Sequence, residues 1–304
     1  MKTMNQPPAF NFPSIRRASR TLLLAALTCL ACLFSHSAAA AQTELLTDMG
    51  LQLQRYSKAV LLADRGRPEG YPQLRASHDR FSTDLELLLK GGKMESCSVP
   101  VPSSALRGRL EVLAKNWTIF DNAGMTLLAQ QETMRQVRAA VKELNDAEGN
   151  MMEYTEQFSI LLLQNQGTPL EMMTAAHLKF LHARLIKNAN RILFDDMVDP
   201  EVAFLFGKDK GTFADVLNGF LNGSKLFRLH AAKGKSKEKL LEISKKFEIE
   251  KSAITVILDN LQSVVTVKHA TQEAMLFADP LFQNLQAIQN GIPSGDACSI
   301  KMKN

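Results

Sequence analysis

Residues 104–145 read SALRGRLEVLAKNWTIFDNAGMTLLAQQETMRQVRAAVKELN and contain no proline. Their apolar residues recur at steps of three, four or seven, the spacing of one helix face that packs as a coiled-coil-like seam. These residues are Leu106, Leu110, Leu113, Trp117, Phe120, Leu127 and Met134, and after a shift in phase Val137, Val141 and Leu144 continue the pattern. An unbroken helix of this length would span roughly 60 Å. We therefore expect a break near Gly124 or near the shift.

Helical patterning extends over nearly all of the chain, and strand patterning is absent. Residues 168–171 (TPLE) combine a cap residue, a proline at the first helical position and a capping-box glutamate, so they predict a helix start. Gly91 and Gly223 follow apolar periodic segments and predict helix ends. We expect helices at about 43–65, 71–90, 104–145, 150–166, 169–195, 200–222 and 236–289, the last broken near 262.

The chain also repeats itself. Residues 55–58 (RYSK) match residues 184–187 (RLIK) at an offset of 129, and the apolar pattern of 81–91 matches that of 213–223 at an offset of 132. Two copies of a helical unit explain the length better than a single bundle. The expected fold is all-α, with two copies of a bundle unit of long helices, at 42–166 and 167–290, and a C-terminal tail at 291–304.

The N-terminus has the pattern of a secretory signal peptide, residues 1–41. Lys2, Arg16, Arg17 and Arg20 precede an apolar run of about 14 residues and an alanine-rich cleavage region. A bilayer-spanning helix needs roughly 20 apolar residues, so cleavage is preferred over a retained anchor. Lipidation at Cys32 is the alternative, although the residues before it form a weak lipobox. We expect a periplasmic bacterial protein.

Removal of this segment changes the charge and the cysteine count. The four cations that leave reduce Lys plus Arg from 36 to 32 against 31 acids, which gives a net charge of +1. This balance gives no support for a nucleic-acid surface. Cys97 and Cys298 remain, and in an oxidising compartment they predict a disulfide if their Cα atoms lie within about 7 Å.

No motif of catalysis is present in the mature chain. It contains no Gly-x-Ser-x-Gly elbow, no Walker loop and no Cys-x-x-Cys pair. His177 and His182 are five residues apart, which turns them about 140° from each other on a helix and excludes a simple pair of metal ligands. We expect a protein that is not an enzyme, with no catalytic residue, no metal and no cofactor.

Two stretches carry a resemblance to a known family. Residues 54–59 (QRYSKA) with 71–81 (YPQLRASHDRF) resemble the first sensory module of PilJ-type type IV pilus methyl-accepting chemotaxis transducers. Residues 206–209 (FGKD), Phe213 and residues 216–223 (VLNGFLNG) resemble the second module. The resemblance covers about 45–290. It implies an all-α fold of two tandem antiparallel four-helix-bundle modules with long helices, which are periplasmic and related to the nitrate-sensing domain of NarX-type kinases.

The resemblance also implies where a ligand would bind. In nitrate sensors an arginine on the first helix meets its symmetry mate across a dimer and holds the anion. The corresponding positions here are Gly50 and Lys179, so nitrate is disfavoured, whereas Lys179 retains a charge that meets anions. Transducers of this family continue into a membrane-spanning output region and this sequence stops at Asn304. We therefore expect a sensory-type binding protein that acts through an envelope or inner-membrane signalling partner or a pilus component.

The basic residues of the repeated first helices are the candidate ligand-binding residues. Arg55 with Lys58, and Arg184 with Lys187, share one helix face in each module, and Lys179 lies nearby. Either these charges gather a small anionic ligand or an acidic partner at a homodimer or partner surface, or they bridge to acids and face water. A helical scaffold of the cell envelope or pilus machinery, without a ligand, is the alternative function.

Overall fold

The computed structural model describes the backbone of residues 15–94 and 98–292, and side chains from residue 40 onward. Within these residues the chain forms eight helices and one short pair of strands, so the expected all-α fold is confirmed. The helices are α1 (Ile15–Asp64), α2 (Gly70–Lys90), α3 (Ser104–Ala129), α4 (Gln131–Gln164), α5 (Pro169–Phe194), α6 (Pro200–Asn222), α7 (Gly234–Asp259) and α8 (Leu261–Gln289).

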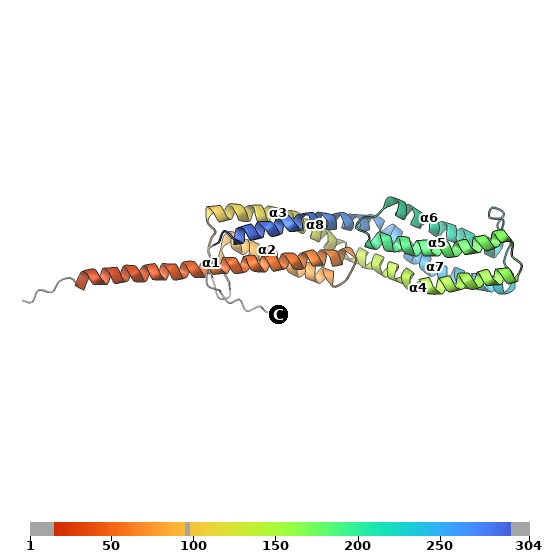
Figure 1. Ribbon diagram of the computed structural model, residues 1–304, viewed down its shortest axis with the longest axis horizontal. Helices are drawn as coiled ribbons and strands as arrows, with labels where there is room; N and C mark the ends of the chain where they lie inside the picture. Colours follow the sequence, from red (N-terminus) through yellow and green to blue (C-terminus); the bar gives the residue numbers. More distant parts are fainter. Residues whose placement is uncertain (1–14, 95–97, 293–304) are drawn as a thin grey trace, which may run out of the picture.

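The helices pack as two four-helix bundles that lie end to end (Figure 1). The first bundle consists of α1, α2, α3 and α8, and the second consists of α4, α5, α6 and α7. Two connections cross between them, from α3 to α4 and from α7 to α8. The expected division at residue 166 therefore does not coincide with the packing, because α4 and α8 each lie in the bundle of the other repeat.

The two crossings have the same local geometry. The residue that follows helix α3, Gln130, has φ −93° and ψ 8°, and the residue that follows α7, Asn260, has φ −102° and ψ 9°. Only one residue separates each pair of helices, so the chain continues in nearly the same direction into the other bundle. The expected breaks are thus present, at residue 130 between Gly124 and the phase shift, and at residue 260, close to 262.

Equivalent positions of the fourth helices of the two repeats are buried at an offset of 130. Pairs on the fourth helices, α4 and α8, are Met134 and Val264, Val137 and Val267, Met151 and Leu281, and Phe158 and Ile288. The same buried face is therefore used by both fourth helices, by α4 against α5 and α7 and by α8 against α1 and α3.

Capping residues fix several helix ends. The Thr168 side chain accepts from the backbone of Glu171, whose carboxylate accepts from the Thr168 backbone, so the expected capping box is present. The same carboxylate accepts from the backbone N–H of His230, at 2.9 Å. Burial acts to raise the pKa of Glu171, but these hydrogen bonds lower it to about 2. Gly91 and Gly223 end α2 and α6 at positive φ, as expected.

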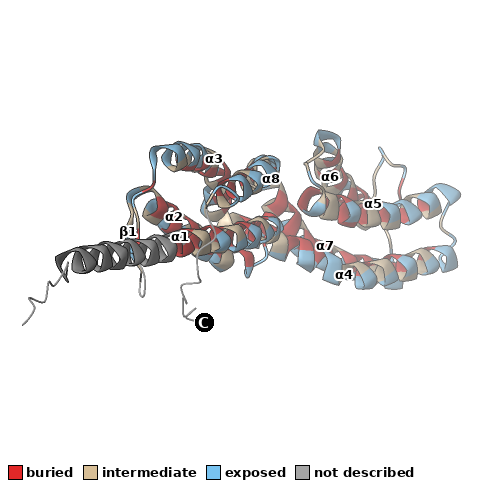
Figure 2. Cartoon of the chain, turned by 60° about the vertical axis from the view of Figure 1, so that its left-hand side comes forward, coloured by how far each residue is buried: buried red, intermediate tan, exposed pale blue. Residues whose placement is uncertain are grey.

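The core is one continuous set of apolar side chains that runs through both bundles. Each helix turns its buried face inward and its exposed face outward (Figure 2). Aromatic rings provide much of the volume, among them Trp117 stacked on Phe81 in the first bundle and Phe213 against Phe247 in the second. The continuous core indicates that the bundles are not separated by a flexible linker.

A short strand pair departs from the all-helical expectation, and a single β-bridge joins Ser224 and Leu229 between α6 and α7. Strand β1 (Gly92–Lys93) pairs antiparallel with β2 (Ser98–Val99) between α2 and α3. Cys97 and Cys298 both lie outside the described residues, so the predicted disulfide stays a prediction. Of the predicted signal peptide, 1–41, the structure describes the backbone from residue 15, as part of α1, and the side chains of residues 40 and 41. Of the predicted tail, 291–304, it describes residues 291 and 292. The signal peptide itself stays a prediction. Over the described part of the chain, no helix carries an apolar stretch long enough to cross a bilayer.

Candidate ligand site at the bundle junction

The structure places the predicted basic residues in different surroundings. Arg184 forms a bidentate ion pair with Asp209 of α6, whose side chain is 1% exposed. This pair links α5 to α6, and Arg184 also lies 5.1 Å from the centre of the Phe180 ring. Lys179 approaches Glu156 of α4, with 3.3 Å between Nζ and Oε2. These two cations already have carboxylate partners within the second bundle.

The remaining three basic residues are exposed. Arg55 and Lys187 form no ion pair with any residue that the structure describes. Lys58 differs from both, because it lines a cavity where the two bundles meet. The five predicted residues therefore do not gather at one place, and their role as a binding surface stays a prediction.

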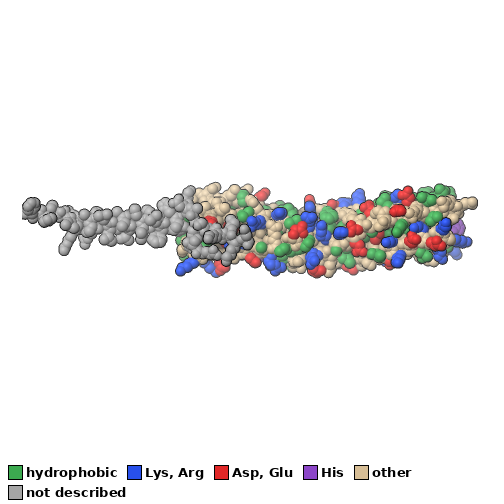
Figure 3. Space-filling view, turned by 90° about the horizontal axis from the view of Figure 1, so that it is seen from below, with side chains coloured by type: hydrophobic (Ala, Val, Ile, Leu, Met, Phe, Trp, Pro, Cys, Tyr) green, Lys and Arg blue, Asp and Glu red, His purple; other side chains and the backbone are tan. Residues whose placement is uncertain are grey.

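The cavity beside Lys58 has a volume of about 370 Å³, and we call it the basic cleft. The end of α1, the turn that follows it, α4 and the end of α5 provide its walls. Its lining residues are Lys58, Leu61, Leu62, Arg65, Arg67, Arg138 and Phe194. Four of these seven carry a positive charge and none carries a negative one. The cleft is therefore a local concentration of positive charge. It differs in this from the face seen in Figure 3, where basic and acidic side chains are interspersed over both bundles.

The turn after α1 shapes the basic cleft. Gly66 has φ +64°, and a Cβ there would lie 2.3 Å from the backbone oxygen of Met134 on α4. Only glycine allows this close approach at a left-handed conformation. Arg138 of α4 then donates from Nη1 to the backbone oxygen of Arg65, at 3.1 Å. The turn is thus held against α4, and Arg65, Arg67 and Arg138 come together.

A second cavity of about 490 Å³ adjoins the basic cleft, and we call it the apolar chamber. The two cavities share Leu61, Arg65 and Phe194 as a common wall. Leu61, Phe194, Met275 and Leu276 form its apolar lining, and its polar lining is Asp64, Arg65, Asp196, Thr271 and Gln272. Leu61, Phe194 and Leu276 are 47%, 41% and 74% exposed. Large apolar side chains therefore face solvent at the junction.

A buried ion pair lies under the chamber. Lys268 of α8 is 1% exposed and donates to Oδ2 of Asp64, at 2.8 Å, and to the backbone oxygen of Leu193 at the end of α5, at 2.9 Å. Thr271 donates to the other Asp64 oxygen, at 3.1 Å. A buried ammonium group requires such partners. The pair joins α1 and α8 of the first bundle to α5 of the second.

Sequence reasoning missed Lys268, although a signal was present. It lies within the apolar run around Val264, Val267 and Thr271, at the offset of 130 from Arg138. A lysine on the buried face of a periodic helix requires a carboxylate nearby. The sequence therefore could have predicted a buried ion pair at Lys268.

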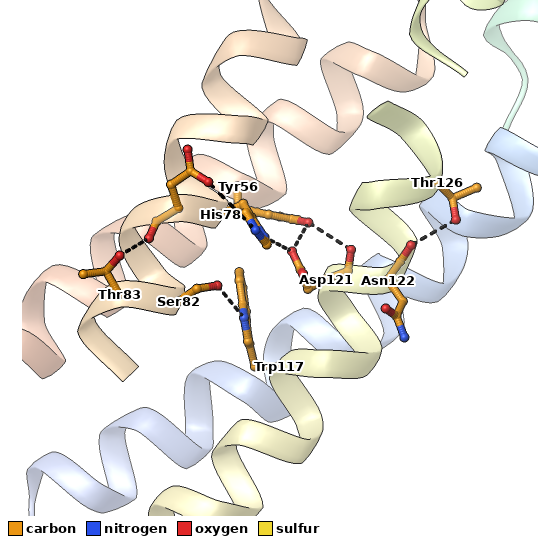
Figure 4. Close-up of polar contacts among 9 residues, drawn as sticks. Tyr56, His78, Ser82, Thr83, Trp117, Asp121, Asn122 and Thr126 are labelled. Atoms are coloured by element: carbon orange, nitrogen blue, oxygen red, sulfur yellow. Dashed lines mark hydrogen bonds and ion pairs between the residues drawn. The ribbon is translucent and has the colours of Figure 1, made fainter. Parts of the chain in front are cut away.

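A second polar group lies inside the first bundle (Figure 4). Tyr56 donates to Oδ1 of Asp121, at 2.8 Å, and Nδ1 of His78 lies 2.7 Å from the same oxygen. Burial, together with the Asp121 charge, raises the pKa of Tyr56. The group joins α1, α2 and α3, and no cavity described at the junction reaches it. Among the described residues, no three His, Cys, Asp or Glu side chains are grouped as metal ligands would be.

Comparison with known proteins found a relative that is similar to this chain in sequence. No protein-family model matches the chain. The chain is similar to PilJ of Pseudomonas aeruginosa. The two are 22% identical over 240 residues, which cover 78% of this chain and 35% of PilJ, so the chain spans about a third of the length of PilJ. The resemblance to PilJ-type proteins expected from residues 54–81 and 206–223 is confirmed.

A solved structure is also similar to the chain. It is a chain of the crystal structure of the TorS sensor domain in complex with TorT in the presence of TMAO, 11% identical, with a TM-score of 0.37. The match covers 81% of this chain and 98% of that chain. A likeness at this level carries no argument about the ligand or the partner of this chain.

Proposed function

We propose that the chain is a periplasmic sensory-type binding protein of the kind found in the ligand-sensing region of type IV pilus chemotaxis transducers. It binds a small anionic ligand in the basic cleft and acts through an envelope or inner-membrane signalling partner or a pilus component. The observation that carries the proposal is the cleft itself, with four cations and no acid in its lining. The similarity to PilJ over 78% of the chain supports a sensory role.

The position of the cleft supplies a physical route from binding to response. A ligand there touches the end of α1 in the first bundle and α4 and α5 in the second. It can therefore favour one relative orientation of the bundles, by as much as its affinity differs between the two orientations. The residues that receive the ligand are also those that hold the bundles together, because Arg138 bonds across the junction to Arg65.

Thermal denaturation with and without small anions tests this function. Phosphate, acetate, citrate and nitrate are added singly to the wild type and to the double variant Lys58→Gln, Arg65→Gln. A ligand that binds only the folded state stabilises it by about 2.7 kcal/mol at a hundredfold excess over Kd. We expect at least one anion to raise the melting temperature of the wild type and not of the variant.

A matched control separates site binding from general screening of charge. Arg107→Gln with Lys115→Gln removes the same two charges from exposed positions on α3. This control should respond to the anion as the wild type does. Equal responses in all three proteins would mean that the cleft is not the site.

A scaffold without a ligand is the second candidate, and the continuous core with the buried Lys268–Asp64 pair favours it. These features brace the two bundles as one rod. A scaffold would show no anion response in any of the three proteins, while still recovering an envelope protein after crosslinking in intact cells.

A further inference from the structure

The two cavities at the junction differ in chemistry and share a wall. The basic cleft presents Lys58, Arg65, Arg67 and Arg138, whereas the apolar chamber presents Leu61, Phe194, Met275 and Leu276. Since Leu61, Arg65 and Phe194 line both, the two cavities are adjacent, and a molecule that lies across these three side chains would contact both cavities. Such a molecule would be charged at one end and apolar at the other.

The cations of the cleft have little competition from protein carboxylates. Arg67 lies 3.4 Å from Glu69, which is an exposed pair of small energetic value. Lys58 and Arg65 form no ion pair with a described residue, and Arg138 uses one nitrogen for the Arg65 carbonyl. Several N–H groups of the cleft are therefore available to an anionic head group.

The two acidic residues of the apolar chamber are consistent with a ligand whose head group is negatively charged. Asp64 already accepts from Lys268 and Thr271, so its charge is neutralised inside the protein. Asp196 is exposed at the rim of the chamber. An anionic head placed there would be repelled by Asp196, which leaves the basic cleft as the place for the head and the chamber as the place for the tail.

We infer that the junction binds a small amphipathic anion, an acyl chain with a carboxylate or phosphate head, with the head in the basic cleft and the chain in the apolar chamber. This inference rests on the proposed function and specifies its ligand class. The combined size of the cavities lies within the usual range of ligand sites, roughly 300–1,000 Å³. The exposed apolar side chains Leu61, Phe194 and Leu276 would be covered by the chain of the ligand.

Isothermal titration with sodium butyrate, hexanoate, octanoate and decanoate, each below its micellar concentration, measures how the affinity depends on the length of the acyl chain. We expect affinity to rise about fourfold for each methylene that enters the chamber. Octyltrimethylammonium, with a cationic head group, and octanol, with an uncharged one, test whether the head group must be an anion. Both should bind at least tenfold more weakly than octanoate. Free octanoate compared with dihexanoylphosphatidylglycerol distinguishes a fatty acid from a phospholipid as the source of the chain, and tighter binding of either identifies that source.

Two variants localise the binding. Leu276→Ser, which changes an exposed side chain, should reduce the gain per methylene and lower the affinity for decanoate more than the affinity for butyrate, whereas Lys58→Gln with Arg65→Gln should lower the affinity of every anion equally. Leu226→Ser is the matched control, since Leu226 is 85% exposed and lies outside both cavities. Melting temperatures of all variants verify that they fold.

The outcomes separate this inference from the proposed function. Affinity that is independent of chain length, or octyltrimethylammonium that binds as tightly as octanoate, overturns the amphipathic ligand while anion binding to the cleft still stands. If no anion of any length binds, the proposed function fails together with it.

Discussion

Asp84 gives a pH dependence of stability that can be worked out from its surroundings. Its side chain is 3% exposed on α2, and Nε of Arg80 lies 3.3 Å from its Oδ2 without forming a hydrogen bond to it. Arg80 instead donates to Asp48 of α1, at 2.7 Å. Burial, only partly offset by the Arg80 charge, raises the pKa of Asp84 from 3.8 to about 7.

The direction of the effect follows from where the proton is held. Between about pH 4 and pH 7 the folded protein keeps a proton on Asp84 that the unfolded chain has lost, so the free energy of unfolding falls as pH rises through this window. The difference between 3.8 and about 7, at about 1.36 kcal/mol for each pH unit, amounts to about 4 kcal/mol. Asp48 takes part in this shift, because its charge and its hydrogen bond with Asp84 also raise the pKa of Asp84. Burial acts to raise the pKa of Asp48 itself, but hydrogen bonds, first of all the one from Arg80, lower it below 3.8, which is outside this window.

Asp84→Asn removes the titration and keeps the shape of the side chain. We expect the variant to match the wild type near pH 4 and to be more stable by up to about 4 kcal/mol at pH 8. Urea denaturation followed by circular dichroism at five pH values measures the difference. Asp215→Asn, at an exposed position on α6, is the control and should show no such trend. A variant that is less stable than the wild type at every pH would refute the reasoning, since Asp84 would then act as a stabilising carboxylate.

Three further substitutions test individual contacts. Gly124→Ala would place a Cβ 1.9 Å from the Tyr56 hydroxyl, so we expect a loss of about 1–3 kcal/mol in urea denaturation, partly recovered when Tyr56→Phe is added. Lys268→Met leaves Asp64 buried without its cation and should cost about 3–5 kcal/mol, whereas adding Asp64→Asn should recover part of this loss, and no recovery would count against a coupled pair. Lys187→Glu changes an exposed charge and should leave the melting temperature unchanged, so that a loss of partner capture by this variant would assign Lys187 to a partner surface.

The helix boundaries could be predicted because they depend on local chemistry. The capping box at Thr168 and the glycines at 91 and 223 act over a few residues, and the structure has helix ends there. Helix α4 is different, since it runs through residues 145–150, where a break was expected between two helices. Gly149 lies inside it, and a Cβ at this position would meet no atom within 4 Å. A glycine on an exposed helix face weakens the helix by about 1 kcal/mol without ending it.

The arrangement of the bundles could not be predicted from periodicity. The pattern identifies which face of α4 is buried but not which helices cover it, and the covering helices are α5 and α7 rather than α1 and α2. The candidate site was missed for the same reason. Lys58 was singled out with Arg55 as neighbours on one helix, yet its neighbours in the cleft, Arg138 and Phe194, come from other helices. Only the crossing at Gln130 brings them together.

The exchanged fourth helices have a consequence for the origin of the fold. A single repeat, such as residues 42–166, would hold three helices in one place and project its fourth helix away from them, with Met134, Val137 and Phe158 uncovered. In this chain the second repeat covers that face with α5 and α7, and its own fourth helix, α8, packs on α1 and α3 in return. An exchange of one element between two like units is what defines a domain-swapped dimer. Here the exchange takes place within one polypeptide, and residues 165–168 join the two repeats.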